Sequence, residues 1–371
     1  MDKANILVIG GGIGGLTSAI ALRREGFDVT VIERDPDWSV YGVGIIQQSN
    51  VLRAMHHLGL LDEYVASGAG FDTVEIFAPD GTKVAQVPSP RLVEGYPANM
   101  GVGRRALHKV LGDRTIGSGA IVRLGVTATA IEEREDGVAV RFSDGTSRNF
   151  DVVIGADGVY SQTRATIFPD APQPEFTGQA VWRYNLPRTE GMDALQAYNG
   201  PIGVGLVPMS PEVMYLFATT PEPGNPRYPR DGLAAAMRSK LAAAAPQIRA
   251  LAELITQDDA VVYRPLETLM IHGPWHKGRV VLLGDAVHAT TPHLGQGAGM
   301  AIEDAIVLAE ELARAETPQA AFTAYRERRY ERCRYIVEQS LAICMGQIGR
   351  GPAVDNHKAT AEMFAVVSQP I

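Results

Sequence analysis

Short apolar runs and amphipathic segments alternate at the start of the chain. Residues 6–9 form a continuous apolar run, as in a parallel strand that is buried on both faces. Residues 13–25 follow with apolar positions at roughly helical spacing, Gly26 ends this segment, and residues 29–32 form a second apolar run. This order of strand, helix and strand predicts a βαβ unit that opens an α/β domain.

The remaining apolar patterns predict many short strands and a helical end. Between residues 172 and 273, strand-like pieces separated by Pro and Gly flank one Ala-rich helix, which is typical of a mostly β domain. After residue 318 the apolar positions keep a period near 3.6, which predicts a long helix. Further strands are expected at residues 73–77, 128–134, 138–143, 152–154, 180–186, 202–207, 214–219, 261–266 and 280–283, and helices at residues 51–64, 105–111, 233–245, 300–315 and 318–346.

These patterns predict an α/β fold with three parts. The first is a discontinuous α/β domain, the second is an inserted domain with a mixed β-sheet, and the third is a C-terminal helical region. The expected ranges are 1–70, 101–171 and 274–317 for the first part, 71–100 and 172–273 for the second, and 318–371 for the third.

Composition narrows the class of protein. With 46% hydrophobic and 20% charged residues, the chain has ample material for a globular core. The net charge of -8 disfavours nucleic acid and anionic membrane surfaces as partners. The sequence shows neither a signal peptide nor an apolar run of transmembrane length, so we expect a cytoplasmic protein. The spacing of Cys333 and Cys344 indicates packing rather than a disulfide or a metal site.

A glycine-rich turn follows the first expected strand. Gly10, Gly12 and Gly15 form a G-x-G-x-x-G pattern between a strand and a helix, which is the context in which this pattern binds dinucleotides. The N–H groups at the helix start can then face a pyrophosphate. Glu33 ends the second strand, where its carboxylate can accept hydrogen bonds from a ribose diol. This motif alone does not distinguish NAD from FAD.

Two later segments make that distinction. Residues 151–164 read DVVIGADGVYSQTR, and residues 278–288 read GRVVLLGDAVH and lead into a glycine-rich stretch at 295–299. With the first motif, they resemble the FAD-dependent aromatic hydroxylases of the para-hydroxybenzoate hydroxylase fold, in the salicylate and 6-hydroxynicotinate monooxygenase-like branch. The resemblance covers nearly the whole chain. It implies a Rossmann-like FAD-binding domain, an inserted mixed β-sheet substrate domain and a C-terminal helical region.

The resemblance also implies a set of FAD contacts. In this family Asp285 would contact the ribityl chain, Arg104 the pyrophosphate, and Gly44 would lie beside the isoalloxazine ring, while Asp157 belongs to a segment near the pyrophosphate. The stretch 295–299 precedes a helix, so its N–H groups and the helix dipole can stabilise the negative charge of a reduced flavin. The expected FAD-binding residues are Gly10, Gly12, Gly14, Gly15, Glu33, Arg34, Gly44, Arg104, Asp157, Asp285, Gly295, Gly297, Ala298 and Gly299.

The family's chemistry implies an activity. Such enzymes take a hydride from NADH or NADPH, bind O2, and pass a hydroxyl group to a ring through a flavin C4a-hydroperoxide. The implied function is an NAD(P)H- and FAD-dependent monooxygenase acting on a small electron-rich aromatic such as a phenol, hydroxybenzoate or hydroxypyridine. For the substrate side we single out Arg183, which can hold a carboxylate bidentately, together with Tyr215, Pro292 and His293.

Several alternatives stay open at the level of sequence. Arg183 could equally form a structural salt bridge, and Tyr215 could be a packed core residue. The fold also suits a reductase or epoxidase that acts on an alkene or polyprenyl chain, or a flavin-binding redox sensor without turnover. The family is often dimeric, so a homodimer is expected, and no metal-ligand constellation stands out in the sequence.

Overall fold

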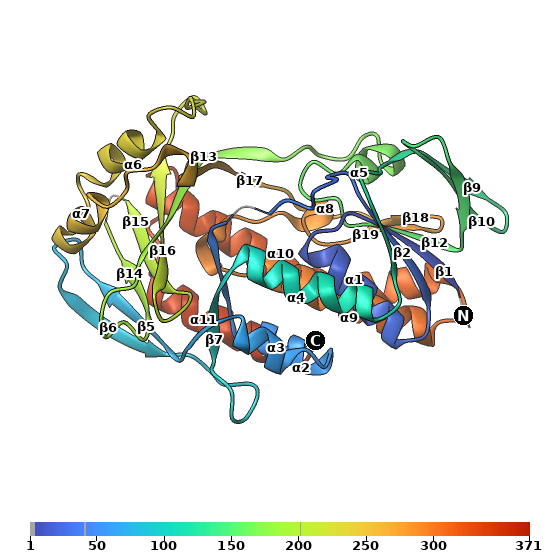
Figure 1. Cartoon of the computed structure of the whole chain (residues 1–371), viewed down its shortest axis with the longest axis horizontal. Helices are drawn as coiled ribbons and strands as arrows, with labels where there is room; N and C mark the ends of the chain where they lie inside the picture. The colour runs from blue at the N-terminus through green and yellow to red at the C-terminus, as the bar shows by residue number, and fades with distance from the viewer. Residues whose placement is uncertain (1–3, 41, 201) are drawn as a thin grey trace.

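A six-stranded sheet organises the nucleotide-binding part of the computed structural model, which describes residues 4–40, 42–200 and 202–371 (Figure 1). Its strands are β1 (Asn5–Ile9), β2 (Asp28–Glu33), β8 (Ile121–Leu124), β12 (Val152–Gly155), β18 (His276–Lys277) and β19 (Val280–Leu282). The strand order is β18–β19–β12–β1–β2–β8, and every pair except β18 with β19 is parallel. The central strands are buried along nearly their whole length, which explains their continuous apolar sequences.

Helices and a smaller sheet complete this part of the molecule. The helix α1 (Ile13–Arg24) packs against both α4 (Arg104–Gly117) and α9 (Gly297–Arg314). An antiparallel sheet of β9 (Ala128–Arg134), β10 (Gly137–Phe142) and β11 (Ser147–Phe150) packs against β1 and β12. The expected α/β fold and its opening βαβ unit are therefore confirmed, with α4 extending beyond the helix that we expected at residues 105–111.

A seven-stranded mixed sheet forms the other end of the molecule (Figure 1). It contains β5 (Thr73–Phe77), β6 (Lys83–Pro88), β13 (Glu175–Pro187), β14 (Leu195–Tyr198), β15 (Gly203–Pro208), β16 (Val213–Pro221) and β17 (Val262–Thr268), in the order β17–β13–β16–β15–β14–β5–β6. The helices α6 (Leu233–Leu241) and α7 (Pro246–Ala252) share a core with Trp182 and Tyr184 of β13. Because side chains alternate along a strand, Arg183 lies on the opposite face of this sheet.

A third, three-stranded sheet of β3 (Gly44–Gln47), β4 (Gly68–Phe71) and β7 (Asn99–Gly103) packs against β15. The apolar patterns did not predict these strands. At Gly101 the backbone of β7 lies so close to the Pro208 carbonyl that a Cβ atom would overlap it. The single helix expected at residues 51–64 is wrong: α2 (Ser49–His57) and α3 (Leu61–Ala66) are separated by Gly59, whose φ of 70° ends the first helix.

The C-terminal helices connect the two ends of the molecule. The expected long helix is confirmed as α10 (Pro318–Gln347), which packs along α9 and reaches β13 (Figure 1). A further helix, α11 (Asn356–Ser368), lies inside the expected C-terminal helical region, although its bounds were not predicted. The remaining elements are α5 (Gln162–Ile167), α8 (Asp285–His288), and the 3-10 turns η1 (Asp258–Ala260) and η2 (Pro292–Leu294). Over the described residues, none of the helices is both long and apolar enough to cross a bilayer.

Candidate active site

One cavity of about 1040 Å³ is lined by residues of the nucleotide-binding part and of the seven-stranded sheet. This volume is at the upper end of what single small-molecule sites have, so it suits a cofactor together with a substrate. The expected FAD-binding residues that line it are Gly12, Gly14, Glu33, Arg34, Gly44, Arg104, Asp285, Gly295, Gly297 and Ala298. The seven-stranded sheet contributes Val181, Arg183, Asn185, Tyr215, Phe217, Val262, Arg264 and Leu266.

The turn between β1 and α1 has the geometry that its glycines predict. Gly10 has a φ of 112°, which is unfavourable for any residue with a Cβ atom. A Cβ atom at Gly15 would overlap the Gly10 carbonyl oxygen, so both residues shape the turn without lining the cavity. Gly12 differs, because a Cβ atom there would meet no atom within 4 Å and the residue faces the cavity. Gly12 is thus the point of this turn where a ligand can approach the backbone.

Glu33 and two aromatic residues hold the loop that follows β1. The Glu33 carboxylate accepts hydrogen bonds from the backbone N–H groups of Gly11 at 2.8 Å and Asp35 at 2.9 Å. The Gly11 carbonyl lies 2.9 Å from both the Trp38 indole nitrogen and His108 Nε2. All of these residues line the cavity. Sequence reasoning missed Trp38 and His108, because neither belongs to a recognisable motif.

Asp157 and Asp285 have different positions, although both belong to family motifs. Asp157 does not line the cavity; its carboxylate accepts hydrogen bonds from Ser161 and from the backbone and hydroxyl of Thr163, which fixes the start of α5. Asp285 lines the cavity, and burial raises the pKa of its carboxyl group above the ordinary value. Arg104 and His288 oppose this pKa shift by favouring the charged carboxylate. Asp285 is therefore available to a ligand, and Asp157 acts on the loop.

The start of α9 is prepared for a negatively charged group. Gly297 and Ala298 line the cavity, and the N-cap residue Gln296 makes no side-chain cap. The Gln296 side chain instead bonds Gln48 and Asn50. The first N–H groups of α9 are thus left for another acceptor, which the helix dipole also favours. Gly299, also expected in the FAD set, lies behind the cavity wall against Gln296 and Asn50.

On the substrate side, Tyr215 is buried and lies near the guanidinium groups of Arg183 and Arg104. Burial raises the pKa of the Tyr215 hydroxyl, while the positive charges of Arg183 and Arg104 act to lower it. Burial, reinforced by Arg104, lowers the pKa of Arg183 to about 10. Arg264 on β17 adds further positive charge near Arg183. This part of the cavity therefore stabilises negative charge, such as that of a phenolate or a carboxylate.

Pro292 and His293 lie next to each other in η2 but have different surroundings. Pro292 lines the cavity, as expected for a residue that borders the substrate. His293 does not line it: its Nδ1 atom lies 2.9 Å from the Thr291 hydroxyl, and its Nε2 atom lies 3.1 Å from Gln347 Oε1. Burial lowers the pKa of His293 to about 4. At neutral pH the ring is uncharged and acts on the cavity through Thr291, which does line it.

A buried ion network supports the cofactor edge from behind. His288, Asp304 and Cys333 place their ligand atoms within 4.8 Å of one another, a distance short enough for a metal ion. Asp304, however, lies 2.6 Å from His288 Nε2 and 2.8 Å from Arg329 Nε, and it accepts a hydrogen bond from the Gly284 N–H. His288 and the Arg329 guanidinium both stabilise the negative charge of Asp304, so the cluster is a structural network. Sequence reasoning did not assign Asp304 or Arg329 to it.

FAD fits this cavity on structural grounds. Two helix starts, those of α1 and α9, face it without side-chain caps, and Gly12 leaves open space beside the first one. These N–H groups suit a pyrophosphate and a reduced flavin ring, respectively. Arg104 adds positive charge and Glu33 adds acceptors for a ribose. The rest of the cavity is lined by residues of the seven-stranded sheet, and its volume of about 1040 Å³ suits a second, smaller molecule beside FAD.

The fold and this cavity define the class of protein as a flavin-dependent oxygenase, and comparison with known proteins gives the family. The family described as FAD binding domain matches residues 3–340, so the chain belongs to it. The chain is 35% identical over 350 residues to 3-amino-4-hydroxybenzoate 2-monooxygenase PtnB3 of Streptomyces platensis, covering 91% of this chain and 87% of the relative. It is 34% identical over 357 residues to aurachin C monooxygenase/isomerase of Stigmatella aurantiaca, covering 93% and 89%.

A solved structure agrees with these relatives. The crystal structure of Klebsiella pneumoniae HpxO complexed with FAD and uric acid matches with a TM-score of 0.85 and 29% identity, over 98% of this chain and 92% of that chain. The protein is therefore an FAD-dependent monooxygenase of the same fold. This result confirms the resemblance inferred from the three motifs.

Proposed function

We propose that this enzyme uses NADH or NADPH, O2 and FAD to hydroxylate a small electron-rich aromatic compound. The observation that carries the proposal is that one cavity is lined both by two uncapped helix starts and by Arg183, Arg104 and Tyr215. In the overall reaction, the substrate, NAD(P)H, O2 and a proton give the hydroxylated substrate, NAD(P)+ and water. Two comparisons support this substrate class. One relative is named for an aminohydroxybenzoate, and the similar solved structure contains uric acid.

The cofactor edge holds FAD by backbone groups and a few charges. Gly10 and Gly15 shape the turn before α1, and Gly14 lies in its first helical turn. Gly12 and Arg104 would contact the pyrophosphate. Glu33 and Arg34 hold the adenosine side, and Asp285 holds the ribityl chain, with Asp157 and Gly299 as positioning residues behind the wall. Gly44, Gly295, Gly297 and Ala298 lie beside the flavin ring. When bound, FAD supplies hydride acceptance and O2 activation, which no side chain of the protein can provide.

The substrate edge orients and activates the ring. The positive charges of Arg183 and Arg104 oppose the rise in pKa that burial would cause in a bound phenol, as they do for Tyr215. The phenolate form is richer in electrons and is therefore the better acceptor of a hydroxyl group. Pro292, Val181 and Leu266 give the cavity apolar walls, which help to exclude water from the reacting atoms. His293 is a positioning residue that fixes Thr291.

The first test is substrate-stimulated oxidation of NADH and of NADPH by the FAD-loaded enzyme. The panel contains phenols, hydroxybenzoates and hydroxypyridines, and products are analysed by mass spectrometry. We expect one ring class to stimulate oxidation and to gain one oxygen atom. Stimulation by an alkene alone, or no stimulation by any aromatic compound despite bound FAD, would overturn the proposal.

A further inference from the structure

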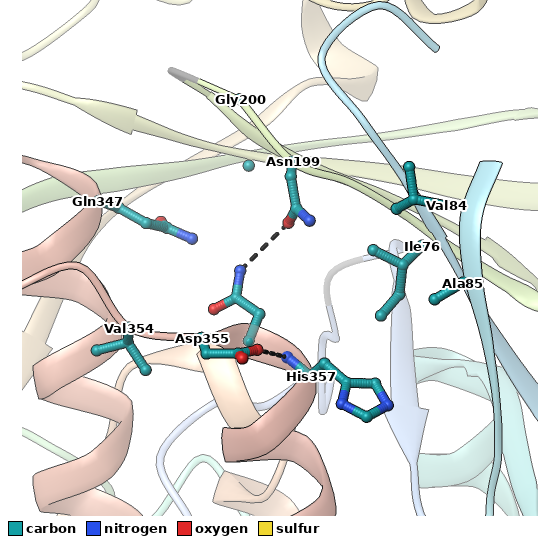
Figure 2. Close-up of a pocket in the computed structure, with 11 residues that line it drawn as sticks. Ile76, Val84, Ala85, Asn199, Gly200, Gln347, Val354, Asp355 and His357 are labelled. Carbon is teal, nitrogen blue, oxygen red and sulfur yellow. Dashed lines mark hydrogen bonds between the residues drawn. The ribbon is translucent and has the colours of Figure 1, made fainter. Parts of the chain in front are cut away.

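A second cavity, of about 430 Å³, lies beside the seven-stranded sheet where α10 ends and α11 begins (Figure 2). Strands β5, β6 and β15 form one side of it, and the connection from Gln347 to His357 forms the other. The residues that line it are Ile76, Val84, Ala85, Asn199, Gly200, Gly203, Gln347, Val354, Asp355, Asn356 and His357. None of these residues lines the flavin cavity, so the second cavity is a separate feature of the surface.

The two cavities share a thin wall. Thr291 lines the flavin cavity, Gln347 lines the second cavity, and the His293 ring bridges them with contacts of 2.9 and 3.1 Å. Gly203 lines the second cavity, while Gly205 of the same strand is covered by the Phe217 ring, which lines the flavin cavity. Residues two positions apart on a strand share a face and lie about 7 Å apart. The cavities are therefore neighbours on one face of β15.

The Gln347 side chain is fixed from one side only. Its Oε1 atom accepts hydrogen bonds from Gln179 Nε2 at 2.9 Å, the Thr219 hydroxyl at 3.2 Å and His293 Nε2 at 3.1 Å. These bonds fix the orientation of the amide and direct its Nε2 atom away from the wall. Figure 2 shows this nitrogen pointing toward the space beside Asn199. Gln347 can thus donate hydrogen bonds into the second cavity.

The titratable side chains that line the second cavity are one carboxylate, that of Asp355, and one imidazole, that of His357. Its polar groups include the amides of Gln347, Asn199 and Asn356, the last two joined by a hydrogen bond of 3.2 Å. Asp355 contributes a carboxylate that also accepts the backbone N–H groups at the start of α11. Among the described residues that line this cavity there is no Lys and no Arg. A carboxylate placed here would meet Asp355, whereas an uncharged group with acceptor oxygens would find donors.

We propose that the second cavity is a distal subsite for an uncharged, hydrogen-bonding tail of the substrate. This inference rests on the proposed function, in which the aromatic ring lies in the flavin cavity. To reach this subsite, the tail would have to displace the Phe217 ring, which covers Gly205, and it would then end beside Gln347 and Asn356. The two cavities then select different chemistry: the flavin cavity selects an electron-rich ring and the second cavity selects a neutral chain. The enzyme's preferred substrate is therefore longer than a simple phenol.

The test compares ligands that differ only in the tail. The probes are phenol and 4-alkoxyphenols of increasing chain length, each chain ending in a hydroxyl group or in a carboxylate. Binding to the oxidised, FAD-loaded enzyme is followed by the change in flavin absorbance, so that turnover is not required. We expect long hydroxyl-ended probes to bind at least tenfold more tightly than phenol, and carboxylate-ended probes to lose this gain.

The variant Ala85→Trp fills the second cavity from β6, and Gln86→Trp on the neighbouring position is its matched control. Ala85→Trp should abolish the preference for long tails and leave phenol binding within twofold, while Gln86→Trp should keep the preference. Loss of the preference in Ala85→Trp but not in Gln86→Trp supports the subsite. If no probe is hydroxylated at the same time, the proposed function fails and the subsite stands. Absence of a tail preference in the wild type, or its equal loss in both variants, overturns the subsite even where phenol is hydroxylated. Absence of binding by every ring overturns both proposals.

Discussion

The environment of Arg183 and Arg104 near Tyr215 disfavours their positive charges, because burial lowers the pKa of both guanidinium groups. Burial and the like charge of Arg104 lower the pKa of Arg183 to about 10. An unliganded site that holds like charges close together gains when an anion enters, because the anion relieves the repulsion. The charge of Arg183 is therefore disfavoured in the free enzyme, and a bound phenolate or carboxylate would stabilise it.

Replacing Arg183 by Met should separate activity from stability. Hydrogen bonds to charged groups contribute about 1.5–3 kcal/mol, so kcat/KM for the aromatic substrate should fall about 10- to 150-fold. The melting temperature should be unchanged or higher, because a buried cation near Arg104 is removed. Arg230→Met, at an exposed position outside the cavity, is the control for a lost positive charge. A loss of activity with a parallel loss of stability would contradict a role in substrate binding.

His293 gives a prediction in the acid range. Its pKa is about 4 in the folded protein, below its ordinary value of 6.5, so the unfolded chain binds this proton more readily. The stability that the neutral ring contributes is therefore present above pH 6.5 and is lost as the pH falls from 6.5 toward 4. The loss has an upper limit of about 3 kcal/mol.

The variant His293→Gln, which does not titrate, should show a shallower fall in the free energy of unfolding over this interval. Urea denaturation at several pH values measures the difference between the two proteins. Parallel curves for wild type and variant would show that His293 titrates normally and is not held neutral by its surroundings.

At the scale of elements, the turn that begins α1 has two kinds of glycine. At Gly15 a Cβ atom would overlap backbone, so Gly15→Ala should destabilise the protein itself by about 1–3 kcal/mol. At Gly12 a Cβ atom meets open space, so Gly12→Ala should leave the apoprotein within about 0.5 kcal/mol of wild type. Gly12→Ala should nevertheless weaken FAD binding at least tenfold, as measured by flavin fluorescence titration of the apoprotein. Equal effects of the two variants on stability would contradict this assignment.

The ion network between α9 and α10 gives a second prediction at this scale. Arg329 is fully buried and lies 2.7 Å from Glu303 and 2.8 Å from Asp304. Arg329→Met removes a buried partner from both carboxylates and leaves them with Arg332 and His288, respectively, which should cost about 3–5 kcal/mol in denaturant unfolding. Arg334 on the same helix also contacts two carboxylates, Glu331 and Glu338, but at the surface. Arg334→Met should change stability by less than about 1 kcal/mol, and a similar cost for both variants would contradict the importance of burial.

Elements were predictable from sequence where their pattern is local. The strand β1 and the helix α10 have continuous or periodic apolar positions, and the β1–α1 turn has a motif whose glycines have direct steric reasons. The strands β3, β4 and β7 were missed because they are short and rich in glycine, and their pairing joins residues far apart in sequence. Side chains alternate along β13, so Trp182 and Arg183 face opposite sides, but this alternation does not say which side holds the cavity. The partners of His293 were also out of reach, since Gln347 lies 54 positions away.

At the scale of the whole molecule, the active site exists only because separate parts of the chain meet. The motifs predicted one edge of the cavity, since residues from each of the three motifs line it. The substrate edge depends on how the seven-stranded sheet lies against α9 and α10, and no local pattern encodes that placement. The second cavity is also formed by segments that are far apart in sequence, because β5, β6 and β15 and the segment that follows α10 all line it. Sequence reasoning therefore reached the cofactor and the reaction class but not the second cavity.

FAD should stabilise the whole molecule, because its expected contacts extend from the β1–α1 turn to the start of α9. A ligand that binds only the folded state adds about 2.7 kcal/mol at a hundredfold excess over its Kd. For a chain of 371 residues this corresponds to a rise in Tm of roughly 3–4 °C. Differential scanning calorimetry of the apoprotein with increasing FAD measures this rise, and Gly12→Ala should shift the whole titration to higher FAD concentration. A Tm that rises for only one of two separate transitions would show that the cofactor stabilises the nucleotide-binding part alone, and that the two sheets unfold independently.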